Sequence, residues 1–181
     1  MEIKGECGFT LLELLMVICI AGILSGFAYL GQDLIYRAQI ASITRQLHAD
    51  IQSARINAIT AGKGYGIRFE SPTTYVLFQF NDCNNNFTYD DDSCNGNARE
   101  ETNPIRITIP SSVLLSKPNS SNDFYNDLLI FDTFGHPRRK NWGMAMMTII
   151  VRHKKDVGII RCISISMSRI RESIWNGSSC I

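Results

Sequence analysis

The chain has 181 residues, of which 45% are apolar, and a formal net charge of +1. A chain of this length buries one ordinary hydrophobic core but hardly two. Its composition lies far from the low apolar content and high net charge that mark disordered chains. One folded domain is therefore expected in addition to whatever the N-terminus forms.

Charge is segregated along the chain. Between Glu70 and Glu101 the sequence has seven acidic residues and one basic residue. From Gly135 to the C-terminus it has nine basic residues and two acidic ones. The near-zero total therefore hides an acidic segment and a basic one.

A long apolar stretch lies near the N-terminus. From Leu11 to Leu30 the sequence contains one charged residue, Glu13. About 20 apolar residues are enough for a helix to span a bilayer. Because the stretch continues into an amphipathic pattern and does not end in a small-residue cleavage site, we interpret it as retained in the protein.

The residues that open this stretch read Gly8-Phe9-Thr10-Leu11-Leu12-Glu13. This motif resembles the class III signal of type IV prepilins and pseudopilins. The resemblance implies that residues 1–8 are a leader, that prepilin peptidase cuts between Gly8 and Phe9, and that Phe9 is then N-methylated.

Glu13 is the charged group within the expected membrane helix. A carboxylate in a hydrocarbon-facing helix costs several kcal/mol unless it finds a partner. The resemblance implies that this partner is the N-terminal amine of a neighbouring subunit, so that pairing favours assembly. The alternative is that the Glu13 side chain extends to the membrane surface near the end of the helix.

The amphipathic pattern that follows predicts a continuation of the helix. Apolar residues recur at intervals of three or four, as on one face of a helix: Ile40, Ile43, Leu47, Ile51, Ala54 and Ala58. Gly62 suits the left-handed conformation at a helix C-terminus. We expect one helix with a membrane half at 9–31 and an amphipathic half at 32–62.

Two further segments resemble the H-type pseudopilin (GspH) and FimT-type minor pilin families. One is Leu47 to Gly62, with Ala54-Arg55-x-x-Ala58 at its centre. The other is Ile130-Phe131-Asp132-x-x-Gly135. The resemblance implies a pilin-like fold, in which the amphipathic half of the helix lies against a globular domain.

Residues 63–181 are expected to be rich in β-strands. Alternating or β-branched runs occur at Gly64–Phe69, Thr74–Phe80, Ile105–Ile109, Leu128–Phe131, Ala145–Arg152 and Val157–Met167. The last two runs flank His153-Lys154-Lys155-Asp156 and predict a hairpin. The sequence therefore predicts an α+β domain, in which an antiparallel sheet packs on the helix.

Four cysteines lie in the region outside the membrane helix: Cys83, Cys94, Cys162 and Cys180. An even number outside the cytoplasm indicates disulfides. Local closure favours Cys83–Cys94 and Cys162–Cys180, although three pairings exist and the sequence does not choose between them.

The most polar segment, from Asn81 to Asn97, allows two interpretations. Its acidic and amide side chains alternate in part as the ligands of a calcium loop do: Asp82, Asn84, Asn86, Asp90 and Asp92. An EF-hand is excluded, because its glycine falls at Phe87 and its closing glutamate at Ser93. Ca²⁺ in a less regular loop is one interpretation, and a solvated loop closed by a disulfide, with no cofactor, is the other.

Near the C-terminus, Ser168-Arg169-Ile170-Arg171 resembles the Gly-Arg-x-Arg segment that some FimT-type proteins use to bind DNA. Five further bases extend the candidate surface: Arg138, Arg139, Lys140, Lys154 and Lys155. Together these seven residues predict a phosphate-binding surface. The alternative is a basic face that solvates the domain or docks onto an acidic neighbour.

An enzyme is not expected. The sequence has no nucleophile elbow, phosphate loop or paired-histidine metal motif, and His48, His136 and His153 are scattered. The resemblance implies a minor pilin or pseudopilin of a type IV pilus or type II secretion machine. Its expected partners are the inner membrane, prepilin peptidase and other subunits, with DNA binding as the second hypothesis.

Overall fold

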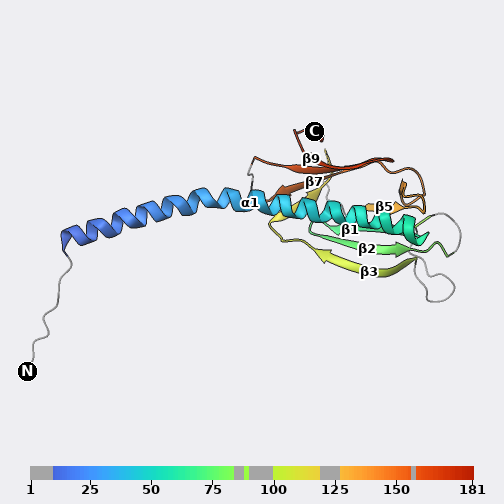
Figure 1. Cartoon of the computed structure of the whole chain (residues 1–181), viewed down its shortest axis with the longest axis horizontal. Helices are drawn as coiled ribbons and strands as arrows, with labels where there is room; N and C mark the ends of the chain where they lie inside the picture. Colours follow the sequence, from blue (N-terminus) through green and yellow to red (C-terminus); the bar gives the residue numbers. More distant parts are fainter. Residues whose placement is uncertain (1–9, 84–87, 90–99, 119–126, 156–157) are drawn as a thin grey trace, which may run out of the picture. The chain divides into compact units, whose positions relative to one another are not determined.

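The computed structural model describes residues 10–83, 88–89, 100–118, 127–155 and 158–181, without the side chains of residues 27–30. These residues form one helix and nine strands (Figure 1). The elements follow one another as α1 (Leu11–Ala61), β1 (Gly64–Ser71), β2 (Thr74–Phe80), β3 (Glu101–Thr108), β4 (Val113–Ser116), β5 (Asp127–Phe131), β6 (Pro137–Arg138), β7 (Met147–His153), β8 (Arg161–Ile165) and β9 (Ile170–Ile174). The chain divides into two compact units, Met1–Tyr36 and Arg37–Ile181.

The first unit contains the N-terminal part of α1. The helix includes a stretch that is long and apolar enough to cross a membrane. Its large apolar side chains between Leu11 and Leu24 are all exposed. These exposed apolar side chains fit the membrane-spanning helix that the sequence predicts.

The second unit is built on the amphipathic part of α1. All six residues of the predicted apolar stripe are buried, with Ile40, Leu47 and Ile51 fully inaccessible. The helix ends at Ala61, and Gly62 has a φ of +62°, the left-handed conformation that ends many helices. Both the packed face and the end of the helix are confirmed.

The strands form two antiparallel sheets. The first sheet has the order β3-β2-β1-β5-β6, and the second has the order β4-β7-β8-β9. The expected hairpin around His153 is confirmed, because β7 pairs with β8 from Met147↔Ile165 to Val151↔Arg161. The α+β class and the antiparallel pairing are confirmed, and the β-rich region is divided into two sheets.

Three strands were missed by the sequence analysis: β4, β6 and β9. The first two have four and two residues, which is too short for an alternating pattern to show. β9 reads IRESI, and the charges of Arg171 and Glu172 hide its pattern. Within the expected strand Val157–Met167, the structure forms only β8.

The main core lies between α1 and the two sheets. Figure 1 shows the C-terminal part of α1 with β1, β2 and β3 on one side and β7 and β9 on the other. One apolar cluster joins the helix stripe to side chains of both sheets, among them Phe69, Phe131, Ile149 and Ile163. A single helix thus covers the inner face of both sheets.

A partly buried hydrogen bond joins the helix to the first sheet. The Tyr75 hydroxyl of β2 donates to Asp50 Oδ2 of α1 over 2.5 Å. Burial raises the pKa of the Tyr75 hydroxyl, and the Asp50 carboxylate raises it further. Tyr75 therefore stays protonated and remains a donor to Asp50.

The outer face of the first sheet carries a second apolar cluster. Phe78 and Phe80 of β2 lie beside Gly66 and Gly64 of β1, and Tyr89 packs on both rings at centroid distances of 5.7 and 6.2 Å. Tyr89 is buried although it belongs to the most polar segment of the sequence. The loop is therefore attached to the sheet at this point, which the interpretation as a solvated loop did not anticipate.

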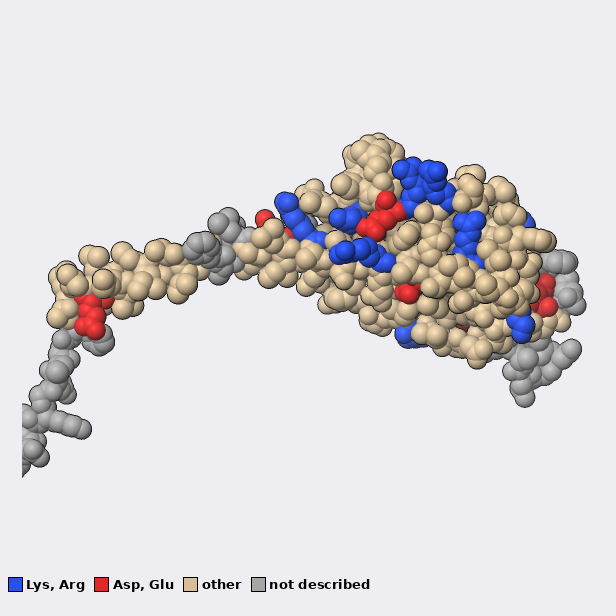
Figure 2. Space-filling model, in the orientation of Figure 1, with Lys and Arg blue, Asp and Glu red and all other residues tan. Residues whose placement is uncertain are grey.

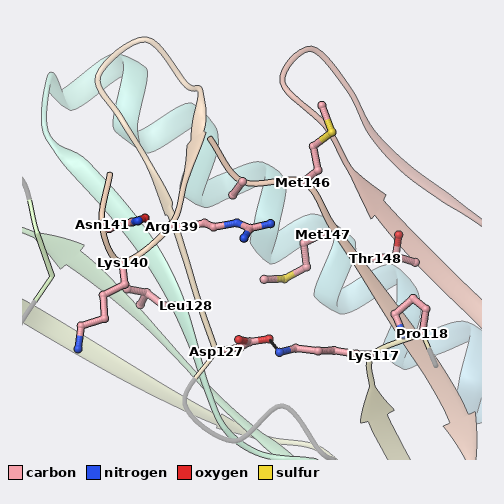
Figure 3. Close-up of a pocket in the computed structure, with 11 residues that line it drawn as sticks. Lys117, Pro118, Asp127, Leu128, Arg139, Lys140, Asn141, Met146, Met147 and Thr148 are labelled. Carbon is pink, nitrogen blue, oxygen red and sulfur yellow. Dashed lines mark ion pairs between the residues drawn. The ribbon is translucent and has the colours of Figure 1, made fainter. Parts of the chain in front are cut away.

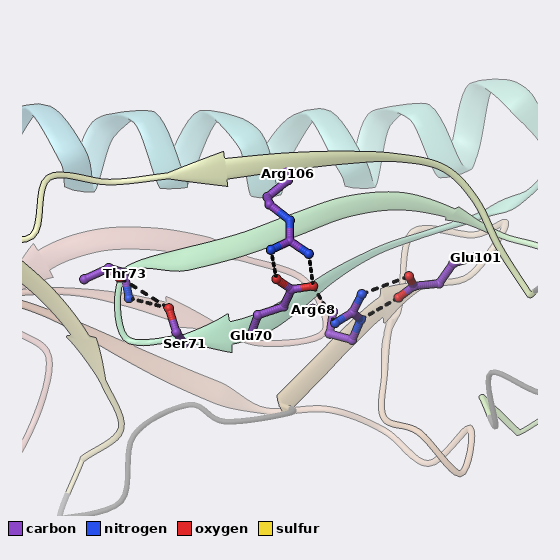
Figure 4. Close-up of polar contacts among 6 residues, drawn as sticks. All are labelled: Arg68, Glu70, Ser71, Thr73, Glu101 and Arg106. Atoms are coloured by element: carbon purple, nitrogen blue, oxygen red, sulfur yellow. Dashed lines mark hydrogen bonds and ion pairs between the residues drawn. The ribbon is translucent and has the colours of Figure 1, made fainter.

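Two acidic residues of the acidic segment form ion pairs on the first sheet (Figure 4). Glu101 accepts from Arg68 Nε at 2.6 Å and from Arg68 Nη2 at 3.0 Å. Glu70 accepts from Arg68 Nη1 at 3.0 Å and pairs with Arg106 at 2.9 Å. The hydrogen bond to Glu101 is the largest cause of the raised pKa of Arg68. These carboxylates hold β1 and β3 together.

The close approach of Phe78 to Gly66 generates a prediction. A Cβ on Gly66 would lie 2.4 Å from Cζ of the Phe78 ring. Gly66→Ala should therefore lower the free energy of unfolding by about 1–3 kcal/mol through overpacking. Urea unfolding of the detergent-solubilised full chain, followed by near-ultraviolet circular dichroism, measures this change.

A double-mutant cycle with Phe78→Leu supplies the control, since the smaller side chain relieves the overlap. The double variant should lose less stability than the sum of the two single variants. Additive losses would show that Gly66 is not kept small by the Phe78 ring.

Candidate functional site

The first turn of α1 contains the motif residues that the structure describes. The Glu13 N–H donates to Thr10 Oγ1 at 3.2 Å, and the Leu14 N–H donates to the Thr10 carbonyl at 3.2 Å. Thr10 is thus the N-cap of the helix, and Glu13 is its third helical residue. Gly8 and Phe9 lie outside the described residues.

Glu13 is an exposed carboxylate among exposed apolar side chains. Its neighbours Leu12 and Leu14 are 70% and 57% exposed. Within the described residues its carboxylate has no ion pair or hydrogen bond. A negative charge near the helix N-terminus is favoured by the helix dipole, by roughly 0.3–1 kcal/mol, which does not offset the several kcal/mol of transfer into hydrocarbon.

The segment Ile130-Phe131-Asp132-x-x-Gly135 forms a closed turn after β5. Asp132 Oδ1 accepts the N–H of Phe134 at 3.0 Å and the N–H of His136 at 2.8 Å. Gly135 donates to the Asp132 carbonyl and has a φ of +76°, a conformation that glycine adopts without strain. The spacing of Asp132 and Gly135 therefore encodes this turn.

Asp132 also binds Arg138 of β6. Its Oδ2 lies 2.9 Å from Arg138 Nε and 2.8 Å from Nη2. Burial alone would raise the pKa of the Asp132 carboxyl, but the His136 N–H, the Arg138 guanidinium and the Phe134 N–H outweigh it and hold the pKa below its ordinary value. Arg138, one of the seven candidate phosphate contacts, is thus engaged inside the domain.

Arg55, the arginine of Ala54-Arg55-x-x-Ala58, connects α1 to the second sheet. Its guanidinium donates to the Met167 carbonyl at 3.2 Å and the Ser168 carbonyl at 3.3 Å. These carbonyls belong to the turn between β8 and β9. The sequence analysis named this arginine without predicting its contact. A long charged side chain next to the buried apolar stripe was the feature of the sequence that could have indicated such a contact.

The cysteines are partly described. Cys162 of β8 and Cys180 are joined by the expected disulfide, with their Cα atoms 6.0 Å apart. Cys83 is also disulfide-bonded, and its expected partner Cys94 lies outside the described residues.

The calcium hypothesis concerns residues that are mostly not described. Asp82 is half-buried, whereas Asn84, Asn86, Asp90 and Asp92 lie outside the described residues. In the part of the chain that is described, no group of three His, Cys, Asp or Glu side chains is placed to hold a metal ion. Calcium binding stays a prediction.

The bases proposed to contact phosphate are not gathered at one place. Lys154 and Lys155 follow β7, whereas Arg169 lies in the turn after β8. These two positions are at opposite ends of β8, and five strand residues span roughly 16 Å. Figure 2 shows Lys and Arg side chains at separate places over the visible face of the molecule, with acidic side chains among them.

Arg139 and Lys140 belong to a pocket of about 490 Å³ (Figure 3). It is lined by Lys117, Pro118, Asp127, Leu128, Arg139, Lys140, Asn141, Ala145, Met146, Met147 and Thr148. Lys117 is paired with Asp127, and Figure 3 shows Arg139 reaching toward Met147. No histidine or cysteine is among these described lining residues.

The contacts of Asp132 predict a pH-dependent contribution to stability. Asp132→Asn should lower the free energy of unfolding by about 2 kcal/mol at pH 7, because it removes charge-assisted hydrogen bonds to Arg138 and to the turn. The pKa of Asp132 is lower in the folded chain than in the unfolded one, where it is near 4. The contribution is therefore fully present above about pH 4 and disappears as the pH falls through the folded pKa.

Unfolding by urea at pH 7, 4 and 3 measures the difference between the wild-type chain and this variant. Asp33→Asn, which removes the same charge at an exposed position of α1, is the matched control. A difference of constant size from pH 7 to pH 3 would contradict the assigned role of the carboxylate.

The N-terminus matches a known family motif, and the fold is similar to that of solved structures. Residues 3–29 match the prokaryotic N-terminal methylation motif, and no match was found among curated protein sequences. Among solved structures, the minor pseudopilin EpsH from the type 2 secretion system of Vibrio cholerae is similar, with a TM-score of 0.50 and 9% identity, covering 76% of this chain and 96% of that chain. The type IV minor pilin FimU of Pseudomonas aeruginosa PAO1 has a TM-score of 0.49 and 14% identity, covering 80% of this chain and 94% of that chain.

At 9% identity the similarity to EpsH shows the fold alone. The methylation motif shows that residues 3–29 have the sequence pattern of a segment that is methylated at its N-terminus. The expected pilin-like α+β architecture, with one long N-terminal helix packed on antiparallel sheets, is confirmed. The chain therefore combines the N-terminal methylation motif with a pilin-like fold.

Proposed function

We propose that the chain is a minor pilin or pseudopilin that assembles into a type IV pilus or a type II secretion pseudopilus, at the tip or in the priming complex. The observation that carries this proposal is the exposed Glu13 carboxylate in the first turn of an apolar helix, inside the matched methylation motif. Before assembly the helix is anchored in the inner membrane, and residues 37–181 lie outside the cytoplasm.

The physical basis of assembly is the charge of Glu13. Cleavage between Gly8 and Phe9 creates a positive amine at the start of the mature chain. A membrane-embedded carboxylate without a partner costs several kcal/mol, and a nearby ammonium group of another subunit removes most of this cost. Each incoming helix therefore gains free energy by placing its own charge beside that of its neighbour.

Thr10 supports this arrangement. Its side chain satisfies the N–H of Glu13, and the N-cap fixes the first helical turn. The Glu13 carboxylate then projects from an ordered helix and remains available to an outside partner. We therefore assign Thr10 a positioning role.

A structural role is favoured over catalysis and over DNA binding. In the described pocket Lys117 and Asp127 are paired with each other, and no group of three His, Cys, Asp or Glu side chains is placed to hold a metal ion among the described residues. Of the candidate phosphate contacts, Arg138 is paired with Asp132, and the others lie on separate elements. DNA binding stays a prediction that no comparison supports.

Processing of the N-terminus is the first test. Intact-mass analysis of the membrane-extracted chain, from cells with an active prepilin peptidase, should show loss of residues 1–8 and one added methyl group on Phe9. The mass of a chain that still begins at Met1 would remove the argument for assembly, because no new amine would exist to pair with Glu13.

Incorporation into filaments is the second test. Glu13→Ala should leave membrane insertion intact but reduce the amount of chain in sheared or purified filaments by about tenfold or more, because it removes the buried charge partner. Asp33→Ala is the matched control, since Asp33 is an exposed acid of α1 beyond the apolar stretch.

Immunoblots of membrane and filament fractions measure both variants against the wild-type chain. Equal incorporation of the Glu13→Ala variant and the wild-type chain would refute the role of the carboxylate. Loss of the Asp33→Ala variant as well would attribute the effect to charge in general.

A further inference from the structure

Three elements of the second unit converge on Arg55. Its guanidinium holds the turn between β8 and β9 through the carbonyls of Met167 and Ser168. On its other side lies the turn after β5, because a Cβ on Gly135 would be 3.2 Å from Arg55 Nε and 2.7 Å from Ile59 Cδ1. The last turns of α1, the β5–β6 turn and the β8–β9 turn thus form one continuous surface.

Each of these elements exposes large apolar side chains at this place. Phe134 is 77% exposed, Ile56 and Ile59 are 56% and 51% exposed, and Met167 is 42% exposed. We call these four residues the junction patch. A single exposed apolar residue is ordinary, but several on segments that meet at one fixed junction, one of them a phenylalanine, are typical of interaction sites.

The edge of the junction patch is positively charged. Arg169 follows Met167 in the same turn, and Arg171 begins the exposed side of β9. Both are exposed, and neither makes an ion pair with the described residues. The acid nearest along the strand, Glu172, is paired with Arg161 at 2.6 Å. The complementary surface is therefore apolar at its centre and bears carboxylates at its edge.

The size of the junction patch restricts the kind of partner. Four side chains offer a few hundred Å², whereas a stable interface between free proteins buries about 800 Å² on each side. A contact of this size becomes effective when both proteins are held in the same membrane, because anchoring raises their effective concentration to the order of millimolar. The apolar part of α1 supplies such an anchor.

We propose that the junction patch docks another membrane-anchored filament subunit, through a surface of that subunit with apolar side chains bordered by Asp and Glu. This inference rests on the proposed function, because the anchoring of both partners makes so small a contact sufficient. Phe134 is the central contact, and Arg169 provides the charge that selects an acidic partner. Arg55 acts from inside by holding the two turns in place.

The first experiment compares two exposed apolar positions in the full chain, produced in cells that make the filament. Phe134→Ser should reduce incorporation into filaments by about tenfold, the effect typical of losing a central aromatic contact. Ile105→Ser is the matched control, because Ile105 is 61% exposed on β3 of the first sheet. Thermal unfolding of both variants should match that of the wild-type chain, since neither side chain is buried.

The second experiment identifies the partner. A photo-reactive benzoylphenylalanine at position 134, and in a control chain at position 105, is activated in membranes before assembly, and the adducts are analysed by mass spectrometry. Crosslinks from position 134 to an acidic peptide of a different anchored subunit, reduced by Arg169→Glu, support the proposal. Absence of such crosslinks, adducts only to a second copy of this chain, or equal adducts from position 105 overturn it.

The two proposals fail separately. A wild-type chain that still begins at Met1 but crosslinks as expected in the membrane contradicts the proposed assembly through Glu13 and leaves the docking surface supported. Normal incorporation of both the wild-type chain and the Phe134→Ser variant overturns the docking surface and leaves assembly through Glu13 supported.

Discussion

The packing of the α1 stripe between two sheets is the contact on which the domain depends. Four of its side chains are large aliphatic groups, and full burial of each contributes about 1.5–3 kcal/mol. Their sum, on the order of 6–12 kcal/mol, equals the net stability of an ordinary domain. Among the described residues α1 is the only helix, so without it both sheets would expose their inner apolar faces.

Burial of apolar surface is not directional, so it does not by itself decide where the helix lies along the sheets. Two polar contacts supply this selection. Asp50 accepts the buried Tyr75 hydroxyl of the first sheet, and Arg55 donates to the β8–β9 turn of the second. The two residues are five positions apart on α1, so one short segment of helix fixes the position of both sheets.

The sequence predicted those features that depend on local periodicity or on a single backbone conformation. The spacing from Ile40 to Ala58 indicated the buried face of the helix, and Gly62 indicated its end. The sequence did not reveal features that depend on distant pairing. Tyr89 is buried only because Gly64 and Gly66 leave room for Phe78 and Phe80 on the outer face of the first sheet.

In the candidate site, too, the sequence predicted features that depend on local contacts and did not predict those that depend on distant pairing. The sequence predicted a helix that opens at the motif and contains Glu13, but it did not identify Thr10 as the N-cap. The basic surface was not predicted correctly, because β8 lies between Lys154 and Lys155 at one of its ends and Arg169 at the other. The ion pair of Arg138 was also not predicted, because the sequence placed its partner Asp132 in a different motif.

The distribution of paired charges separates the two parts of the chain. Where the chain folds on itself, several carboxylates are paired internally, as Asp132, Glu70, Glu101 and Glu172 show. Glu13 has no such partner among the described residues and lies where the chain has no fold of its own. In the proposed assembly, the unpaired Glu13 carboxylate lies in hydrocarbon, where a charge without a partner is costly. Association driven mainly by this charge would leave the domain free to make contacts that are weak in affinity and selective in partner.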